Sequence, residues 1–414
     1  MSFTSVRQLR TRISALDALL FTALLWFLAK FVRYVFPTLF DSLQVTYDVS
    51  ATLLGWAFTG FMMAYALMQF PSGVLGDRFG SVRVITIGGV MTSMGALVLF
   101  IDLPFMIFVL IMMVIGLGTG IHKTVAVRLL SKTYPDRTGR MLGIFDTFGT
   151  SAGAIAPAAV IAIAVFPVER PSWQVLFLIT GVVGLVITAG FLFRVPPRLR
   201  ARQAAGQSEP ATEDTDGSDK NKSWRSYTKL LSNKKFTTFI VVTLCFSFTY
   251  NGVVAFLPLY LTQEAGLSTA VAGTLYSALF IASVTQLVSG ELSDRVGSLS
   301  VITGTLMLAT ISIGSFVLLT GSGPIILGAA VVCLGIGAHG FRPVRGVYLM
   351  KTVPNEIAAG GFGMVRTLLM VAGAIAPGIV GTVSDLVGFQ PAFWLLTGSM
   401  AVGTVLSAWL AITN

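Results

Sequence analysis

The sequence predicts an all-α membrane protein with twelve transmembrane helices in two six-helix, pseudo-symmetric bundles. Three observations lead to this fold class. Of the 414 residues, 54% are hydrophobic and only 11% are charged, and the mean hydropathy is +0.82. Apolar windows of spanning length recur along the chain, and motifs of the first half return in the second half. A soluble domain of this size does not carry so apolar a composition.

Twelve windows of about 20 apolar residues are each long enough to cross a bilayer as a helix. The first six lie near residues 15–40, 51–72, 84–101, 104–131, 140–165 and 174–194. The other six lie near residues 236–261, 269–289, 301–320, 324–350, 359–384 and 391–412. The first window continues at full spanning length behind a basic stretch, which predicts a signal-anchor helix rather than a cleaved signal peptide.

A polar stretch separates the two sets of windows. Residues 196–235 are rich in Ser, Asp, Glu and Lys and offer little to bury. Such a composition predicts a flexible cytoplasmic linker. The predicted domains are therefore an N-terminal bundle over residues 1–195, the linker over 196–235, and a C-terminal bundle over 236–414.

The basic residues predict the orientation in the membrane. If both termini and the linker are cytoplasmic, the predicted outer loops hold only Arg170 among basic residues, and the remaining loop cations are inside. Besides the linker, these inner residues are Arg7, Arg10, Arg12, Arg78, Arg83, Lys132, Arg137, Arg140, Arg295 and Lys351. We therefore expect a multi-pass protein of the cell membrane with both termini inside, and the short loops point to a prokaryote.

The two halves repeat each other. SGVLGDRFGSVRVIT (72–86) matches SGELSDRVGSLSVIT (289–303) at an offset of 217, and AGAIAP (152–157) recurs as AGAIAP (372–377). Two six-helix repeats around a central site form an architecture that permits alternating access.

The segments 73–83 and 290–300 carry a family resemblance. They are similar to the cytoplasmic loop signature Gly-x-Leu-x-Asp-Arg-x-Gly of the major facilitator superfamily, and the twelve-helix pattern covers essentially the whole chain. Ser81 stands where the family usually has a basic residue, and no basic residue follows Gly297 in the second copy. The resemblance implies that these loops latch the two halves in the outward-open state, through Gly73, Asp77, Arg78, Gly80, Gly290, Asp294, Arg295 and Gly297.

Fixed cations inside the spans are the main clue to function. LGTGIHKTVAVR (117–128) aligns with LGIGAHGFRPVR (334–345) at the offset of 217, so the only two histidines fall on one repeat position. Against one clearly interior acid, Asp146, stand seven cations and these histidines. A charge at the bilayer centre costs about 2.5–3.5 kcal/mol or more, which predicts a water-filled cavity with an anionic partner. The predicted substrate-binding residues are Lys30, Arg33, His122, Lys123, Arg128, His339, Arg342, Arg345 and Arg366.

Spacing and side-chain chemistry favour an anionic substrate. Positions 339, 342 and 345 step by three and share one stripe of a helix, as do Lys30 and Arg33. A guanidinium group can hold an oxyanion in a bidentate way, and an ammonium group supplies a point charge. Further polar candidates for the cavity are Tyr34, Tyr250, Asn251, Gln69 and Gln286.

Several alternatives remain open for these residues. Arg128 and Arg345 can snorkel to the cytoplasmic surface, and Arg366 can pack against a helix end. Asp146 is a coupling or charge-pair residue whose candidate partners are Lys123 and Arg128. The histidines can bind substrate, carry a coupling proton, or remain neutral in hydrogen bonds to the backbone.

The function favoured by the sequence is secondary active transport of a small anion, such as a carboxylate, phosphate ester or inorganic oxyanion, by alternating access. The pattern is loosely similar to the anion-transporting branches of the superfamily. Expected partners are the solute, coupled protons or a counter-anion, and membrane lipid, with no nucleic acid and a monomeric state. One alternative is a proton-coupled exporter of drug-like compounds, which generally uses an acid buried in the first, fourth or seventh helix. Another is a non-transporting membrane sensor. No nucleophile elbow, phosphate loop or metal cluster is present, so neither an enzyme nor a cofactor is expected.

Overall fold

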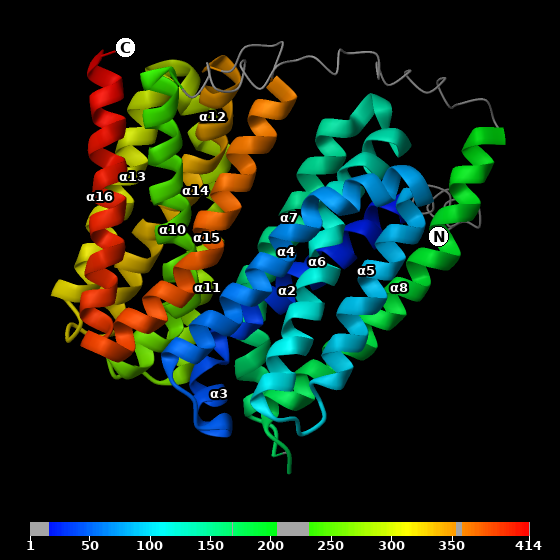
Figure 1. The fold of residues 1–414 in the computed structure, drawn as a ribbon, viewed down its shortest axis with the longest axis horizontal. Coiled ribbons are helices and arrows are strands. Elements are labelled where there is room, and N and C mark those ends of the chain that lie inside the picture. The colour runs from blue at the N-terminus through cyan, green and yellow to red at the C-terminus, as the bar shows by residue number, and fades with distance from the viewer. Residues whose placement is uncertain (1–15, 168, 205–231, 353–357, 414) are drawn as a thin grey trace, which may run out of the picture. The chain divides into compact units, whose positions relative to one another are not determined.

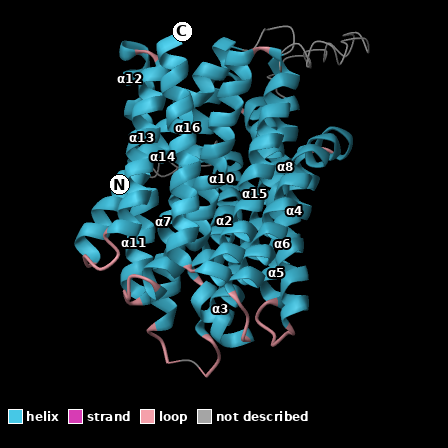
Figure 2. Ribbon diagram, turned by 60° about the vertical axis from the view of Figure 1, so that its left-hand side comes forward, coloured by secondary structure: helices cyan, strands magenta, loops and turns pink. Residues whose placement is uncertain are grey.

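The computed structural model describes residues 16–167, 169–204, 232–352 and 358–413. Within these ranges the chain forms helices and loops without a strand, as Figure 2 shows. Twelve helical segments of the described residues are long and apolar enough to cross a membrane. The predicted fold class is therefore confirmed. Of the predicted linker, residues 205–231 lie outside the described residues.

The first half contains eight helices within the described residues, two of which lie outside the twelve predicted windows. α3 is a short helix directly after the first span, and η1 is a single turn before α7. The bounds are α2 (Asp17–Thr38), α3 (Phe40–Tyr47), α4 (Ala51–Phe79), α5 (Ser81–Val98), α6 (Phe105–Thr133), η1 (Pro135–Arg137), α7 (Thr138–Ala164) and α8 (Ser172–Ala204). Because α8 continues to Ala204, the first nine residues of the predicted linker, 196–204, are helical.

The second half follows the same order, with its second span divided by a 3-10 turn. The bounds are α10 (Lys234–Gln263), α11 (Thr269–Ile281), η2 (Ala282–Val284), α12 (Thr285–Val296), α13 (Ser298–Leu318), α14 (Pro324–Thr352), α15 (Ala358–Val387) and α16 (Phe389–Thr413). Side chains cap two of the starts. Asn233 accepts from the amide of Lys235 at 3.0 Å, and Ser268 accepts from that of Val271 at 3.4 Å. Such caps satisfy amides that the first helical turn leaves without partners.

Tertiary contacts divide the chain into two compact units whose borders cut through three helices. Unit 1 comprises Met1–Tyr34, Leu67–Gly153 and Phe166–Ser218, and unit 2 comprises Val35–Ala66, Ala154–Val165 and Asp219–Asn414. Within unit 1, α5 packs against α6 and α8. Within unit 2, α10 packs against α15 and α16, and α13 packs against α14 and α16 (Figure 1). Unit 2 thus includes the adjoining ends of α2, α4 and α7 from the first half.

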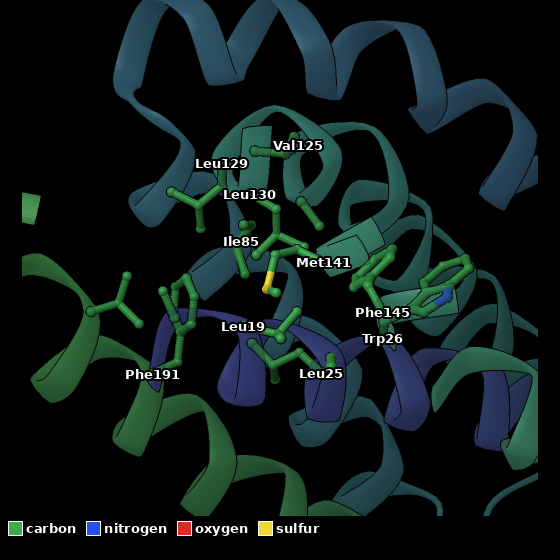
Figure 3. Close-up of a cluster of buried hydrophobic side chains, with 14 of the residues drawn as sticks. Leu19, Leu25, Trp26, Ile85, Val125, Leu129, Leu130, Met141, Phe145 and Phe191 are labelled. Carbon is green, nitrogen blue, oxygen red and sulfur yellow. The ribbon is translucent and has the colours of Figure 1, made fainter. Parts of the chain in front are cut away.

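Aromatic and aliphatic side chains fill the core of unit 1. Leu19 and Leu25 of α2 lie with Ile85 of α5, Leu130 of α6 and Met141 of α7 (Figure 3). At the edge of this cluster the rings of Trp26 and Phe145 stack, with centroids 5.5 Å apart and an angle of 14° between their planes. This stacking holds the Trp26 indole in place, and the same indole is part of the candidate functional site described below.

Gly149 of α7 is required for this position of the indole. A Cβ atom at residue 149 would overlap Trp26 Nε1, whereas a Cβ at Gly143 on the same helix would meet nothing within 4 Å. We expect Gly149→Val to destabilise the protein by about 1–3 kcal/mol, as overpacked cores do. Gly143→Val is the matched control. Thermal unfolding of the detergent-purified protein should show a lower Tm for the first variant only, and equal Tm values would contradict this account of the packing.

In unit 2, the start of α4 is capped by a carboxylate from α15. Asp385 accepts hydrogen bonds from the amides of Ala51 at 3.2 Å and Thr52 at 2.7 Å. A carboxylate at a helix N-terminus satisfies free amides and interacts favourably with the helix dipole. The first turn of α4 is thus anchored to the last turns of α15.

The contact between α4 and α15 continues along both helices and is very close. Trp56 donates to Thr382 at 3.2 Å, and the amide of Gly378 donates to Thr59 at 2.9 Å. A Cβ atom at Gly55 would overlap the carbonyl oxygen of Pro377. We call this the α4–α15 interface, and it joins a first-half helix to a second-half helix at the end where α3 lies.

Candidate functional site

In unit 1, two lysines from different helices lie against one indole ring. Lys30 follows Trp26 by one turn of α2, and its Nζ lies 4.9 Å from the ring centroid. Lys123 of α6 places its Nζ 5.2 Å from the same centroid. An aromatic face attracts a cation by about 0.5–2 kcal/mol, depending on how far the pair is desolvated. The indole therefore holds two ammonium groups in one region although they repel each other.

α7 contributes a carboxylate and a second ring to this group. Asp146 forms an ion pair with Lys123, and the Lys123 Nζ lies 5.4 Å from the centroid of Phe145. We call Trp26, Lys30, Lys123, Phe145 and Asp146 the Trp26 cluster. Its fixed charges are two ammonium groups and one carboxylate, so the cluster is positive and can attract an anion.

The α2 face extends this positive region by one turn. Arg33 is half-buried, with its Cζ 6.0 Å from the centroid of Tyr34. Lys30 lies between the two rings of α2, since its Nζ is also 5.8 Å from the centroid of Tyr34. The predicted pair Lys30 and Arg33 thus shares an aromatic surface.

His122 points away from the Trp26 cluster although it precedes Lys123 in sequence. It is buried, its Nδ1 lies 3.0 Å from the carbonyl oxygen of Gly118, and its Cε1 would lie 3.1 Å from a Cβ atom at Gly88 of α5. Its Nε2 has no hydrogen-bond partner among the described residues. Successive residues of a helix diverge by about 100°, so the structure does not bring His122 and Lys123 together.

Arg128 lies with a loop residue rather than with the lysines. It forms an ion pair with Asp77 near the end of α4. A predicted substrate-binding residue therefore contacts a predicted latch residue, and both belong to unit 1. Further back along α6, Gln69 of α4 donates to the Gly120 carbonyl at 2.6 Å and accepts from Thr124 at 3.2 Å. These bonds fix α4 against α6.

The two signature loops have the same backbone turn but different ion pairs. Gly80 and Gly297 have φ angles of 84° and 91°, a region that favours glycine. Gly73 and Gly290 instead lie inside α4 and α12. In the first copy, Arg78 places its Cζ 5.6 Å from the centroid of Phe79. In the second copy, Arg295 pairs with Glu291 one turn earlier, and Asp294 is exposed.

In unit 2, one arginine lies on a tyrosine ring beside a histidine. The Arg342 Cζ is 4.4 Å from the centroid of Tyr250 of α10. The buried His339 places its Nδ1 3.5 Å from a guanidinium nitrogen of Arg342 and 3.4 Å from Nε2 of Gln286. Both neighbours are donors, so these long contacts are favourable only when Nδ1 is unprotonated and accepts. We call Tyr250, Gln286, His339 and Arg342 the Arg342 cluster.

This second cluster holds its positive charge without a carboxylate. Neither Arg342 nor Arg345 forms an ion pair with an acidic residue in the part of the chain that the structure describes. Arg345 is half-buried, with its Cζ 5.8 Å from the centroid of Phe341, and Arg366 is exposed on α15. A half-buried guanidinium group with no acidic partner favours an anionic ligand.

The clusters occupy related places in the sequence repeat. Under the offset of 217, Arg33 of α2 corresponds to Tyr250 of α10, and Gln69 of α4 corresponds to Gln286 of α12. Each cluster includes residues from the first and fourth spans of its own half, and α7 in unit 1 and α12 in unit 2 add further members. The sequence reasoning missed Trp26 and Gly149; the signal for Trp26 was its position one turn before Lys30.

Comparison with known proteins agrees with the architecture. A family model of the Major Facilitator Superfamily matches residues 21–341 and 284–414. The probable sulfoacetate transporter of Cupriavidus necator is 24% identical over 94% of this chain and 91% of that protein. The hexuronate transporter of Bacillus subtilis is 25% identical over 87% of this chain and 86% of its own.

A solved structure of similar fold is a bacterial homologue of the human lysosomal transporter Spinster. Its TM-score is 0.76 at 14% identity, with 96% of each chain covered. At this identity the likeness concerns the fold alone.

Proposed function

The chain belongs to the major facilitator superfamily, and we propose that it is a secondary active transporter of small organic anions in the cell membrane. The observation that carries this proposal is the Arg342 cluster, in which a half-buried guanidinium group lies on Tyr250 without an acidic partner among the described residues. A cation in a membrane span is costly unless a counter-charge accompanies it. A bound anion supplies that charge.

The Trp26 cluster supports the same substrate class from the other unit. Its two ammonium groups exceed its one carboxylate. We assign substrate binding to Lys30, Arg33, Lys123 and Arg342, each of which contacts the anion at some stage of the transport cycle. We assign supporting roles to the other predicted residues, which are His122, Arg128, His339, Arg345 and Arg366. His122 and Arg128 contact other groups of unit 1, and His339 contacts a guanidinium nitrogen of Arg342.

The names of the relatives suggest carboxylate or sulfonate substrates. Sulfoacetate and hexuronates both carry an oxyanion on a small, polar skeleton. A guanidinium group matches such oxyanions with two parallel hydrogen bonds, and a lysine adds a point charge. We propose a substrate of this chemical class.

We further propose that both termini are cytoplasmic, because this topology places nearly all loop cations inside. The α4–α15 interface then lies at the outer face. Its hydrogen bonds and close helix contact would close that face, and separation of the two helices would open it during alternating access. The loop residues Asp77, Arg78, Asp294 and Arg295, with their glycines, are proposed to act at the inner face.

Two other functions predict a different ligand or no transport. An exporter of drug-like cations would use a buried acid in the middle of α2, α6 or α10. The buried acid of α2, Asp17, lies in the first turn of the helix, 3.9 Å from Arg194, and the acid of the Trp26 cluster lies on α7 and is paired with Lys123. A sensor would bind an anion without moving it. Both alternatives are therefore tested by ligand binding followed by transport.

Thermal unfolding of the detergent-purified protein tests the substrate class. A ligand that binds only the folded state at 100 times its Kd stabilises it by about 2.7 kcal/mol. We expect glucuronate or sulfoacetate to raise the Tm, and tetraphenylphosphonium, a lipophilic cation, to leave it unchanged. Arg33→Gln should remove the anion-dependent shift, while the exposed control Arg170→Gln should retain it. Stabilisation by the lipophilic cation alone would contradict the proposal.

A further inference from the structure

We infer that Asp146 is the proton carrier of the transport cycle and that the substrate anion triggers its protonation by competing for Lys123. This inference rests on the proposed function, because it requires an anion that binds the Trp26 cluster. It proposes that protons are the coupling ions and that Asp146 of α7 binds them. Three features of the cluster support it.

The first feature is the ion pair itself. Lys123 and Asp146 come from adjacent spans, α6 and α7, and pair with each other. The ammonium group is the substrate-binding element proposed above. An anion that approaches Lys123 must therefore share it with the Asp146 carboxylate or displace that carboxylate.

The second feature is a difference in exposure. The Asp146 side chain is 56% exposed and the Lys123 side chain only 24%. A carboxylate that faced lipid would be strongly unfavourable, so we assign its open side to an aqueous path. Water can then deliver a proton to Asp146, whereas Lys123 is enclosed by Trp26 and Phe145, whose ring faces attract its ammonium group.

The third feature is the balance of charges around the pair. The neighbouring charged group is Lys30, which lies on the same indole, with Arg33 one turn further along α2. His122 is directed toward α5 and does not face the carboxylate. The surrounding groups are thus cations that attract a second anion into the cluster, where it repels Asp146.

The resulting exchange balances in charge and protons. Before binding, the ammonium of Lys123 is paired with the carboxylate of Asp146. A monovalent anion and one proton enter; the anion pairs with Lys123, and the proton adds to a carboxylate oxygen of Asp146. A carboxyl group that loses its counter-ion and gains a nearby anion favours its neutral form. One proton therefore accompanies each monovalent anion, and both leave together when the ion pair forms again.

Proteoliposomes with the full chain test this inference, with glucuronate as the anion and the membrane potential clamped at zero. Wild-type protein should accumulate glucuronate about tenfold for an inward proton gradient of one pH unit. Asp146→Asn should lose this accumulation but still exchange glucuronate in counterflow, which needs no proton gradient. Asp146→Glu should restore the accumulation. If Asp146→Asn does not fold, Asp146→Ser provides the same test.

The possible outcomes distinguish failure of this inference from failure of the proposed function. Counterflow without any response of the wild-type protein to the proton gradient would overturn the inference and leave anion transport intact. So would gradient-driven accumulation by Asp146→Asn, or loss of counterflow in a folded Asp146→Asn protein. Failure of the wild type to exchange any carboxylate or sulfonate would overturn the proposed function itself.

Discussion

Arg342→Gln is expected to reduce anion transport by about 100-fold while the protein remains folded. Gln keeps hydrogen-bonding groups and much of the length of the side chain but removes the charge that lies 4.4 Å from the Tyr250 ring centroid. Loss of one partner of a desolvated, hydrogen-bonded charge pair costs about 2–5 kcal/mol, and about 1.4 kcal/mol corresponds to a factor of ten. Initial rates of glucuronate uptake into proteoliposomes measure the effect.

Two further variants test whether the effect depends on the guanidinium geometry and whether it is specific to this arginine. Arg342→Lys retains the charge but not the planar fork, so we expect an intermediate loss of transport. Arg170→Gln removes an exposed arginine that pairs with Asp102 and has no proposed role in transport, and it should transport normally. Normal transport by Arg342→Gln would show that this guanidinium group is structural.

Gly55→Val is expected to produce the second large effect, loss of transport with the α3 end of unit 2 left open. The added Cβ would overlap the Pro377 carbonyl oxygen in the α4–α15 interface. Overpacking costs about 1–3 kcal/mol, which changes the balance between closed and open states by about 5–150-fold. Because alternating access needs both states, transport should fall by a similar factor.

Thiol labelling can follow this opening directly. In a background with Cys245→Ser and Cys333→Ser, Thr382→Cys places a thiol where the wild-type hydroxyl accepts a hydrogen bond from Trp56. Gly55→Val should accelerate its reaction with a membrane-impermeant maleimide by about 5–150-fold. Gly304→Val is the matched control, because a Cβ atom there meets nothing within 4 Å. Equal labelling rates in the two variants would exclude the interface as a closure.

The sequence predicted the fold well because a bilayer imposes simple requirements. A span needs about 20 apolar residues, and loops can be polar. The ends of the helices were harder to predict from the sequence. α4 continues to Phe79 and α8 to Ala204, beyond their apolar windows, because polar residues at the membrane surface can extend a helix. α3 was missed, since an eight-residue helix outside the spans has no hydrophobic signature of this kind.

The candidate site was predictable as a list of charges but not as a set of contacts. Lys123 was an open choice among partners for Asp146, and the structure pairs the two. Arg128 was the other choice, but it pairs with Asp77. Such pairings depend on the relative heights and rotations of packed helices, which the residue pattern of one chain does not determine. The role of Trp26 depends equally on Gly149, a contact between distant positions.

Counterflow of radiolabelled glucuronate into proteoliposomes tests the central claim, transport of a small organic anion, most directly. Vesicles preloaded with unlabelled glucuronate should take up the labelled compound transiently, and external sulfoacetate should compete with it. Vesicles without protein, or with Arg342→Gln, should show little uptake. Transport of tetraphenylphosphonium with no exchange of any carboxylate or sulfonate would contradict the claim.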